Sequence, residues 1–323
     1  MKESVLFWPV RLKDHHLEIL DETRIPNEVH YLKAHDYHEA IDAVVEMKTR
    51  AFGQFLTVCY AFVLELKKSK LADKAHEMAL LQKVAKAFNQ SRPTFPFEEV
   101  TSMMLGFAHK VYNKSDFKKE FIDSVVGFLE QGIRHSRYQR AQIASQLLKD
   151  GDTVLTHCNV SGELSLIGEL CRKLGKNIKF FATETRPYFQ GARLTAWELK
   201  EEGFDVTLIP DNAVAKLMID KKVNCVIVGS DRSAKNGDFA NKIGTYQIAL
   251  LAKHFKIPFY VLAQPSQKLK SGRDIPIEIR KEEEILTFSG HNMAPVGVHA
   301  YYPGFDVVPH NLVTKYIRIE NHG

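Results

Sequence analysis

The sequence is poor in cysteine and lacks long apolar runs, and each shortage excludes a class of protein. Its four cysteines show neither the paired spacing of a metal site nor the pattern of a small disulfide-linked domain. No stretch approaches the roughly 20 apolar residues of a membrane-spanning helix. The apolar run from Val5 to Val10 is too short for a secretory signal, and Pro9 interrupts it. We therefore expect a cytoplasmic protein that binds no metal and contacts no membrane.

The common nucleotide-binding patterns are also missing. Neither a G-x-G-x-x-G motif nor a Walker-type loop follows any predicted strand, which disfavours dinucleotide and nucleoside-triphosphate sites. The net charge of +5 is mild, and the densest basic tract, from Arg134 to Arg140, is too short to form a nucleic-acid surface by itself. A solvated helix face explains that tract more simply. We expect no cofactor and no nucleic-acid partner, but a small phosphorylated substrate suits the modest surplus of cations.

What is present is enough apolar sequence for two domains, and its periodicity changes along the chain. Strand-like segments at Val5–Leu12 and His16–Leu20 indicate a small hairpin. Helical spacing follows up to about residue 114, and a long amphipathic helix, interrupted near Gly132, is predicted over 116–149. We expect an N-terminal β-hairpin and helical domain over 1–115 and a connecting helix over 116–149.

From Gly151 onwards, apolar strand-like runs alternate with amphipathic helical segments such as Glu163–Leu174. This alternation predicts βαβ units and a mainly parallel sheet. The chain is therefore expected to be an α/β protein whose Rossmann-like catalytic domain covers 150–323. The predicted strands are Thr153–Thr156, Ile178–Ala182, Val206–Ile209, Val223–Val228 and Pro258–Leu262.

Polar and reactive side chains follow the predicted strands, where open α/β sheets bind their ligands. Right-handed crossovers bring the carboxyl ends of all these strands to one edge of the sheet. Turn chemistry alone explains some Asp and Asn residues there, but not so many in succession. The groups concerned are His157-Cys158-Asn159, Glu184-Thr185-Arg186-Pro187, Asp211-Asn212, Asp231 and Gln264.

Two of these residues are candidates for acid/base chemistry. Cys158 lies between a strand and a helix predicted to begin near Gly162, and a helix N-terminus stabilises a thiolate. The alternative is a small buried hydrophobic residue, which is our expectation for Cys171 and Cys225. Asp231 could cap a helix, but a carboxylate facing a thiol across a pocket forms a general acid/base pair.

The segment from Glu184 to Ala196 is predicted to be a long loop that enters a helix. Arg186 and Arg193 are candidates for binding phosphate, although a structural ion-pair cluster with Glu184 is an equal alternative. Gln190 is a candidate for binding sugar hydroxyls.

With these residues identified, the chain resembles the methylthioribose-1-phosphate isomerase family. That family lies within a superfamily that includes initiation factor 2B regulatory subunits and ribose-1,5-bisphosphate isomerases. The resemblance covers nearly the whole chain, and the Gly-Ser-Asp-Arg stretch ending at Arg232 is its most specific part. The matching segments are Leu20 to Glu28, Thr156 to Asn159, Glu184 to Leu199, Gly229 to Tyr246 and Phe305 to Pro309.

The resemblance implies a homodimeric enzyme that isomerises 5-methylthioribose 1-phosphate to the ribulose 1-phosphate in methionine salvage. It implies catalysis by Cys158 and Asp231. Our hypothesis for their roles is that Asp231 acts on the ring oxygen and that Cys158 moves the C2 proton. A hydride shift from C2 to C1 is the alternative. The substrate-binding residues that it implies are Arg50, Arg92, Gln190, Asn241 and Lys242.

Two other functions stay open. One is isomerisation of another pentose 1-phosphate, such as 5-deoxyribose 1-phosphate or ribose 1,5-bisphosphate; the other is a non-catalytic regulatory role like that of the initiation-factor subunits. The chain departs from the family's pattern at Phe52, where a small residue is typical beside Arg50, and after Cys158, where Val160–Glu163 is a shorter segment. Phe52 either lines the pocket near the C5 substituent or packs the helix that follows Arg50.

Overall fold

The computed structural model describes residues 3–70, 73–91, 97–263 and 268–318. The chain divides into two compact units, Met1–Tyr138 and Gln139–Gly323. The boundary falls within a continuous helical stretch that consists of α5 (Phe117–Gly127), the π-helical segment η1 (Phe128–Arg134) and α6 (His135–Leu147). The interruption predicted near Gly132 is this π-helical segment.

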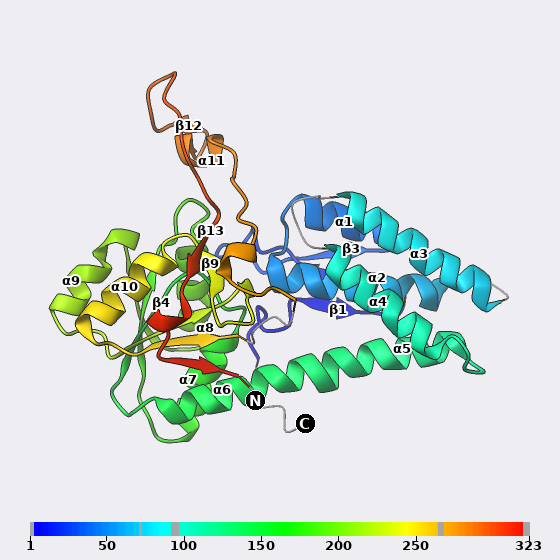
Figure 1. Ribbon diagram of the computed structural model, residues 1–323, viewed down its shortest axis with the longest axis horizontal. Helices are drawn as coiled ribbons and strands as arrows, with labels where there is room; N and C mark the ends of the chain where they lie inside the picture. Colours follow the sequence, from blue (N-terminus) through cyan, green and yellow to red (C-terminus); the bar gives the residue numbers. More distant parts are fainter. Residues whose placement is uncertain (1–2, 71–72, 92–96, 264–267, 319–323) are drawn as a thin grey trace. The chain divides into compact units, whose positions relative to one another are not determined.

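The N-terminal unit combines a small antiparallel sheet with helices (Figure 1). The predicted hairpin forms between β1 (Val10–Leu12) and β2 (Leu17–Leu20), and the sequence analysis missed a third strand, β3 (Tyr31–Ala34). Helix α2 is central, since 12 of its 18 residues are buried. The helices before α5 are α1 (Tyr37–Val45), α2 (Ala51–Lys68), α3 (Lys74–Ser91) and α4 (Phe97–Val111).

The C-terminal unit contains a six-stranded, wholly parallel sheet with the strand order β14-β10-β7-β4-β5-β6. The predicted Rossmann-like fold is thereby confirmed. All five predicted strands are present, and β14 was missed because it is short and follows polar sequence. The strands are β4 (Thr153–Thr156), β5 (Lys179–Thr183), β6 (Asp205–Ile209), β7 (Cys225–Gly229), β10 (Phe259–Leu262) and β14 (Lys315–Ile317).

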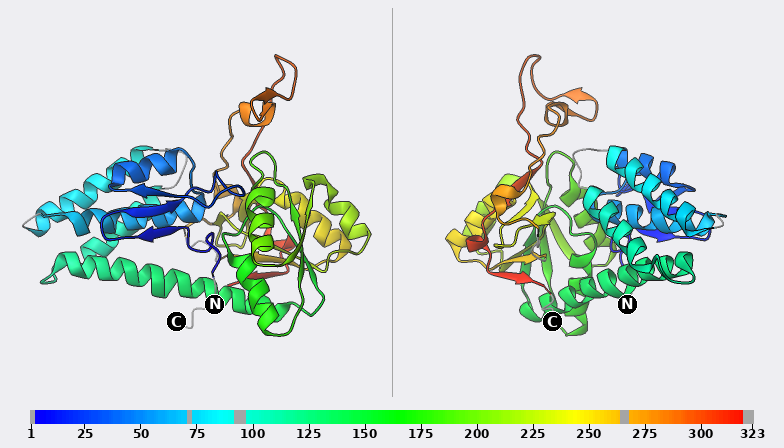
Figure 2. Two further views of the ribbon diagram at one scale, coloured as in Figure 1. Left: turned by 180° about the vertical axis from the view of Figure 1, so that it is seen from behind. Right: turned by 45° about the vertical axis from the view of Figure 1, so that its right-hand side comes forward.

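Helices cover both faces of this sheet (Figure 2). On one face, α9 (Val214–Ile219) and α10 (Thr245–Phe255) pack over a core that includes Val226, Val228 and Val261. On the other face lie α7 (Glu163–Lys173) and α8 (Trp197–Glu201). Short turns of other helix types are η2 (Gly191–Ala196), η3 (Asp211–Ala213), η4 (Gly272–Asp274) and η5 (His310–Leu312).

A second, antiparallel sheet of β8 (Arg232–Ser233), β9 (Phe239–Lys242) and β13 (Phe305–Val308) follows the loop after β7. Between η4 and β13 the chain forms an arm that projects from the unit, drawn in orange in Figure 1. The arm carries α11 (Glu283–Leu286), β11 (Thr287–Phe288) and β12 (His291–Asn292). The base of the arm is joined by a bridge between Ile279 and Pro303.

Candidate active site at the carboxyl edge of the sheet

Three neighbouring strands bring the candidate residues of the C-terminal unit to one edge. Strands β7, β4 and β5 are adjacent in the sheet and parallel. Asp231 follows β7, Cys158 follows β4, and the loop that contains Gln190 follows β5. Because parallel strands end at a common edge, these residues lie where open α/β sheets hold ligands.

Cys158 is held in a strained position. Its backbone has a φ of 64°, in the left-handed region that residues other than glycine rarely adopt. The Cys158 amide donates a hydrogen bond to Thr185 Oγ1 (3.0 Å), and Thr195 Oγ1 donates to the Cys158 carbonyl (2.6 Å). Two threonines that are distant in sequence therefore fix the backbone that carries this thiol, which is 8% exposed.

The helix expected after Cys158 begins at Glu163, as the sequence predicted. Asn159 Oδ1 accepts a hydrogen bond from the Ser161 amide (2.9 Å), and Gly162, with a φ of 82°, is the N-cap residue. Gly162 has no side chain with which to cap the helix, and no side-chain capping bond is present there. The N-terminus of α7 therefore directs its partial positive charge towards the loop of Cys158.

His157 connects this loop to the segment that carries two other candidates. Its Nε2 lies 2.8 Å from the Ile243 carbonyl, which can only accept, so Nε2 carries the proton. Nδ1 then accepts from Thr183 Oγ1 (2.6 Å). Burial is the main reason that the pKa of His157 is lowered, and the ring is neutral. This buried bond holds Ile243, the residue after Lys242, beside the end of β4.

Asn241 and Lys242 end strand β9, and both are buried. Asn241 Nδ2 donates to Thr245 Oγ1 (3.0 Å), and the ammonium group of Lys242 lies 4.7 Å from the ring centroid of Phe305. The Asp231 amide donates to the Ala240 carbonyl (2.9 Å), which places Asp231 beside the same strand. The Asp231 side chain is exposed, in contrast to Cys158.

The N-terminus of the following helix, α10, is already occupied. Its N-cap is Gly244, with a φ of 102°. The Asp306 carboxylate accepts hydrogen bonds from the amides of Gly244 (2.6 Å) and Tyr246 (3.0 Å). A side chain of the protein therefore fills the position at which helix N-termini commonly bind anions.

Gln190 is buried at the start of η2, and its Oε1 has no hydrogen-bond partner among the residues that the structure describes. The backbone packs tightly here, because a Cβ on Gly191 would lie 1.7 Å from the Thr183 carbonyl oxygen. A buried amide oxygen without a partner is costly unless a ligand satisfies it. This observation supports the predicted role of Gln190 in substrate binding.

Other polar residues of this edge have structural roles. The Asp211 carboxylate accepts from the amides of Thr185 and Arg186, both at 2.7 Å, and so braces the strained loop after β5. The Arg186 guanidinium lies over the rings of Phe189 (5.1 Å) and Phe288 (5.6 Å). The predicted alternative, an ion pair between Glu184 and Arg186, is not among the contacts of the described residues. Gln264 lies outside them.

The remaining cysteines behave as buried hydrophobic residues, as expected for Cys171 and Cys225. Burial raises the pKa of Cys171 to about 11 and that of Cys225 to about 12, and it raises the pKa of Cys59 further still. A thiol with a raised pKa is a poor nucleophile and a poor base at neutral pH.

Of the two arginines predicted in the N-terminal unit, Arg92 lies outside the described residues. Arg50 is the N-cap residue of α2, and its Nε donates to Glu22 Oε2 (2.6 Å). Glu22 also accepts from Thr49 Oγ1 (2.9 Å). Sequence reasoning missed this positioning role of Glu22, although the residue belongs to the segment from Leu20 to Glu28 that carries the family resemblance.

Phe52 packs against aromatic and cationic side chains of its own unit. Its ring makes an edge contact with Trp8 (5.5 Å between centroids) and lies under the Arg137 guanidinium (3.9 Å). Arg137 is buried and also donates to the Phe7 carbonyl (3.1 Å). These contacts favour the packing role over the pocket-lining role for Phe52.

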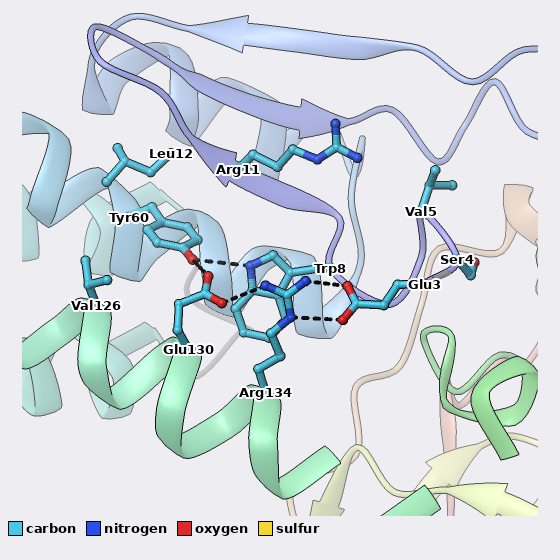
Figure 3. Close-up of a pocket in the computed structure, with 10 residues that line it drawn as sticks. All are labelled: Glu3, Ser4, Val5, Trp8, Arg11, Leu12, Tyr60, Val126, Glu130 and Arg134. Atoms are coloured by element: carbon cyan, nitrogen blue, oxygen red, sulfur yellow. Dashed lines mark hydrogen bonds and ion pairs between the residues drawn. The ribbon is translucent and has the colours of Figure 1, made fainter. Parts of the chain in front are cut away.

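A cavity of about 400 Å³ lies in the N-terminal unit, and none of the residues that line it is a predicted site residue (Figure 3). Its polar side chains, of which Trp8 and Tyr60 are buried, bind one another. Trp8 Nε1 donates to Tyr60 Oη (3.2 Å), Tyr60 donates to Glu130 (3.0 Å), and Arg134 binds both Glu130 and Glu3. No polar group of this set is left to recognise a ligand.

Residues 3–70, 73–91, 97–263 and 268–318 are the part of the chain that the structure describes. They contain no group of three or more His, Cys, Asp or Glu side chains arranged to hold a metal ion. None of their helices combines the length and the apolar character needed to cross a membrane.

Comparisons with known proteins agree with this architecture. The model of the initiation factor 2 subunit family matches residues 54–318. A protein of Fervidobacterium nodosum named methylthioribose-1-phosphate isomerase is 40% identical, over 93% of this chain and 90% of its own length. One of the same name from Desulforamulus reducens is 35% identical, over 94% and 92%.

Two solved structures are similar over 96% of the chain. The 5-methylthioribose 1-phosphate isomerase of Pyrococcus horikoshii OT3 has a TM-score of 0.85 and 30% identity, and 90% of it is covered. The protein titled translation initiation factor eIF-2B, subunit delta, from A. fulgidus has a TM-score of 0.82 and 32% identity, with 94% covered. The chain belongs to the initiation factor 2 subunit family and, within it, to the methylthioribose-1-phosphate isomerases.

Proposed function

We propose that this chain is an aldose-ketose isomerase that converts 5-methylthioribose 1-phosphate to the corresponding ribulose 1-phosphate, a step of methionine salvage. The observation that carries the proposal is full-length similarity, at 35–40% identity, to proteins named for this reaction. The site at the carboxyl edge of the sheet adds a thiol beside a helix N-terminus, a carboxylate and a buried cation.

The chemistry must open a ring whose anomeric oxygen carries phosphate. In the proposed mechanism Asp231 gives a proton to the ring oxygen as its bond to C1 breaks, and the Cys158 thiolate takes the proton from C2. Cys158 then returns a proton to C1 while Asp231 recovers one from the 2-hydroxyl, which becomes the carbonyl. Both groups end in their starting states, so no external oxidant or reductant is consumed. A hydride shift from C2 to C1 gives the same product.

The proposed substrate contacts are the residues that the family resemblance implies. Lys242 and Asn241 lie beside the end of β4 through the bond between His157 and Ile243. Gln190 offers a buried amide oxygen. Arg50, oriented by Glu22, and Arg92 are proposed to bind phosphate, since arginine pairs readily with phosphate oxygens.

The direct test is a substrate panel. The purified chain is incubated with 5-methylthioribose 1-phosphate, 5-deoxyribose 1-phosphate and ribose 1,5-bisphosphate, and formation of ketose 1-phosphate is measured. We expect the highest kcat/KM with the methylthio compound. Turnover of the bisphosphate alone would instead assign another pentose 1-phosphate as substrate.

A regulatory role is the second candidate, because a neighbour of similar TM-score is titled as an initiation factor subunit. Absence of turnover with all three compounds would favour that role. The homodimer is a proposal that rests on the family resemblance, and the cytoplasmic location is a proposal that rests on the sequence patterns. Light scattering coupled to gel filtration tests the dimer.

Phe52 tests what determines the C5 preference. Its packing against Trp8 and Arg137 leads us to expect that Phe52→Leu lowers the melting temperature. The ratio of kcat/KM between the methylthio and deoxy substrates should stay constant. A change in an apolar pocket is worth roughly 1–3 kcal/mol, so a shift of ten-fold or more in that ratio would place Phe52 beside the substrate.

A further inference from the structure

The hydroxyl of Tyr302 has no explained role in the site described above. The residue is 3% exposed, and its Oη has no hydrogen-bond partner among the described residues. Tyrosine hydroxyls that are buried usually find a partner, because leaving one unpaired costs about 1–3 kcal/mol. An unpaired buried hydroxyl therefore indicates a partner that is not part of the folded chain, such as a ligand.

The position of Tyr302 is fixed by the base of the arm. Its carbonyl accepts a hydrogen bond from the Arg280 amide (2.8 Å), next to the bridge between Ile279 and Pro303. The Arg280 guanidinium binds the carboxylate of Glu284 (2.6 Å) and the hydroxyl of Tyr188 (2.5 Å). The polar side chains of this cluster are thus hydrogen-bonded to one another, whereas Tyr302 Oη has no partner among the described residues.

The same cluster belongs to the candidate active site. Tyr188 lies in the loop after β5, two residues before Gln190, and that loop contributes Thr185, which binds the Cys158 amide. Tyr302 itself is four residues before Asp306, which caps the helix after Lys242. The base of the arm therefore contacts the loop after β5 through Arg280 and Tyr188, and the same loop holds the Cys158 backbone through Thr185.

Electrostatics agree with this placement. Burial is the main reason that the pKa of Tyr302 lies far above its ordinary value. The nearby Tyr188, Glu284 and Cys158 raise this pKa further, whereas Arg280 lowers it. The hydroxyl consequently keeps its proton at neutral pH and is available as a donor.

We propose that Tyr302 is a substrate-binding residue whose buried hydroxyl donates a hydrogen bond to an oxygen of the sugar phosphate held beside Cys158. This inference rests on the proposed function, since it names a contact of the same site. Together with Gln190 Oε1, it gives the proposed site one donor and one acceptor that have no partner among the described residues. Such a pair recognises hydroxylated sugar carbons and contributes little to binding an apolar C5 substituent.

The experiment compares Tyr302→Phe with Tyr301→Phe, which removes the same atom from an adjacent side chain that is 80% exposed. We expect kcat/KM of Tyr302→Phe to fall roughly ten-fold or more, as for other lost hydrogen bonds in desolvated sites. Its melting temperature should equal or exceed that of the parent, because an unpaired hydroxyl is removed from the interior. Tyr301→Phe should match the parent in both measurements.

Binding of the ketose 1-phosphate product, measured by calorimetry, separates this idea from the proposed function. If the parent turns over no substrate, the function is wrong, and weaker binding of sugar phosphates to Tyr302→Phe than to Tyr301→Phe still supports the contact. If the parent is active and Tyr302→Phe retains kcat/KM within about two-fold, the contact is wrong. A lower melting temperature with unchanged kcat/KM would assign Tyr302 a structural role only, and would likewise overturn the proposal.

Discussion

The cavity of the N-terminal unit and the carboxyl edge of the C-terminal sheet are both lined by polar and aromatic side chains, but they differ in what those side chains lack. In the cavity, Arg134, Glu130 and Tyr60 bind one another, so the polar groups are satisfied without a ligand. At the edge, Gln190 Oε1 and Tyr302 Oη are buried without partners among the described residues. The size of a hollow is thus a weaker guide to function here than the number of unsatisfied buried groups.

The two regions also differ in backbone strain, which is found at the carboxyl edge and not in the lining of the cavity. Around the carboxyl edge Cys158, Ser161, Thr185 and Phe189 all have φ between 50° and 64°. Such conformations cost roughly 1–3 kcal/mol each and persist only where the surrounding structure holds them. No lining residue of the cavity has a positive φ. Strain and unpaired polar groups coincide at the edge, which is what a preorganised binding site requires.

The largest expected effect comes from removing the acid/base groups at the edge. Cys158→Ala and Asp231→Asn should each lower kcat by roughly a hundred- to ten-thousand-fold, as loss of a general acid or base does. Circular dichroism and thermal unfolding should show an intact fold. Cys171→Ala, a control in the core, should keep kcat, and normal turnover by Cys158→Ala would remove the thiol from the mechanism.

Removal of the proposed phosphate contacts should come next. Lys242→Ala and Arg92→Ala should weaken substrate binding by about 1.5–3 kcal/mol each, the usual contribution of a hydrogen bond to a charged group. The readouts are KM and the dissociation constant of a substrate analogue. Lys235→Ala, which changes an exposed lysine near the same motif, is the control. Equal affinities for the Lys242 and Lys235 variants would contradict a role of Lys242.

Gly191 tests how closely packed the edge must be. Gly191→Ala forces a Cβ towards the Thr183 carbonyl, and overpacking of this kind costs roughly 1–3 kcal/mol of unfolding free energy. Gly106→Ala in α4 meets no atom within 4 Å and should be neutral or stabilising, by up to about 1 kcal/mol. Chemical denaturation measures both. Equal stability of the two variants would show that the edge is not tightly packed at Gly191.

His157 should produce the smallest effect, seen as a pH dependence of stability. Its pKa in the folded state is lowered from an unfolded value of about 6.5, so the unfolded chain takes up a proton first. The neutral ring therefore contributes fully to the free energy of unfolding at pH values above the unfolded pKa. This contribution is lost as the pH falls towards the folded-state pKa, by at most about 1.4 kcal/mol for each pH unit. The free energies of unfolding of the parent and of His157→Gln, measured by chemical denaturation across this pH range, should converge at low pH. A constant difference between the two would show that His157 does not cause the pH dependence.

Sequence patterns predicted the strands that consist mainly of apolar residues. They missed the strands that are recognisable only by their hydrogen bonds to a partner strand. The apolar runs of β4, β5, β7 and β10 were recognisable because both faces of the sheet are covered there. The edge strand β6 is largely exposed, and its β-branched and apolar residues identified it instead. Strands β9 and β13 were not recognisable, since Asn241, Lys242 and Asp306 interrupt any apolar pattern and only their mutual register makes them strands. The π-helical form of the segment around Gly132 depends on packing and has no comparable sequence signal.

The candidate site divides in a similar way. Cys158, Asp231 and Gln190 could be found because polar residues follow strands in a fixed order. Residues that act by contacting the backbone elsewhere, such as Glu22 and Asp211, could not, because their partners are set by the fold. Tyr302 was missed for the same reason: its significance lies in a bond that the folded chain does not make.

The Asp306 carboxylate at the N-terminus of α10 also affects how the site selects among anions. Since Gly244 and Tyr246 already donate to it, a phosphate could reach those amides only by displacing a tethered anion. The carboxylate thereby makes the N-terminus of α10 less attractive to a phosphate than that of α7, which has no side-chain cap.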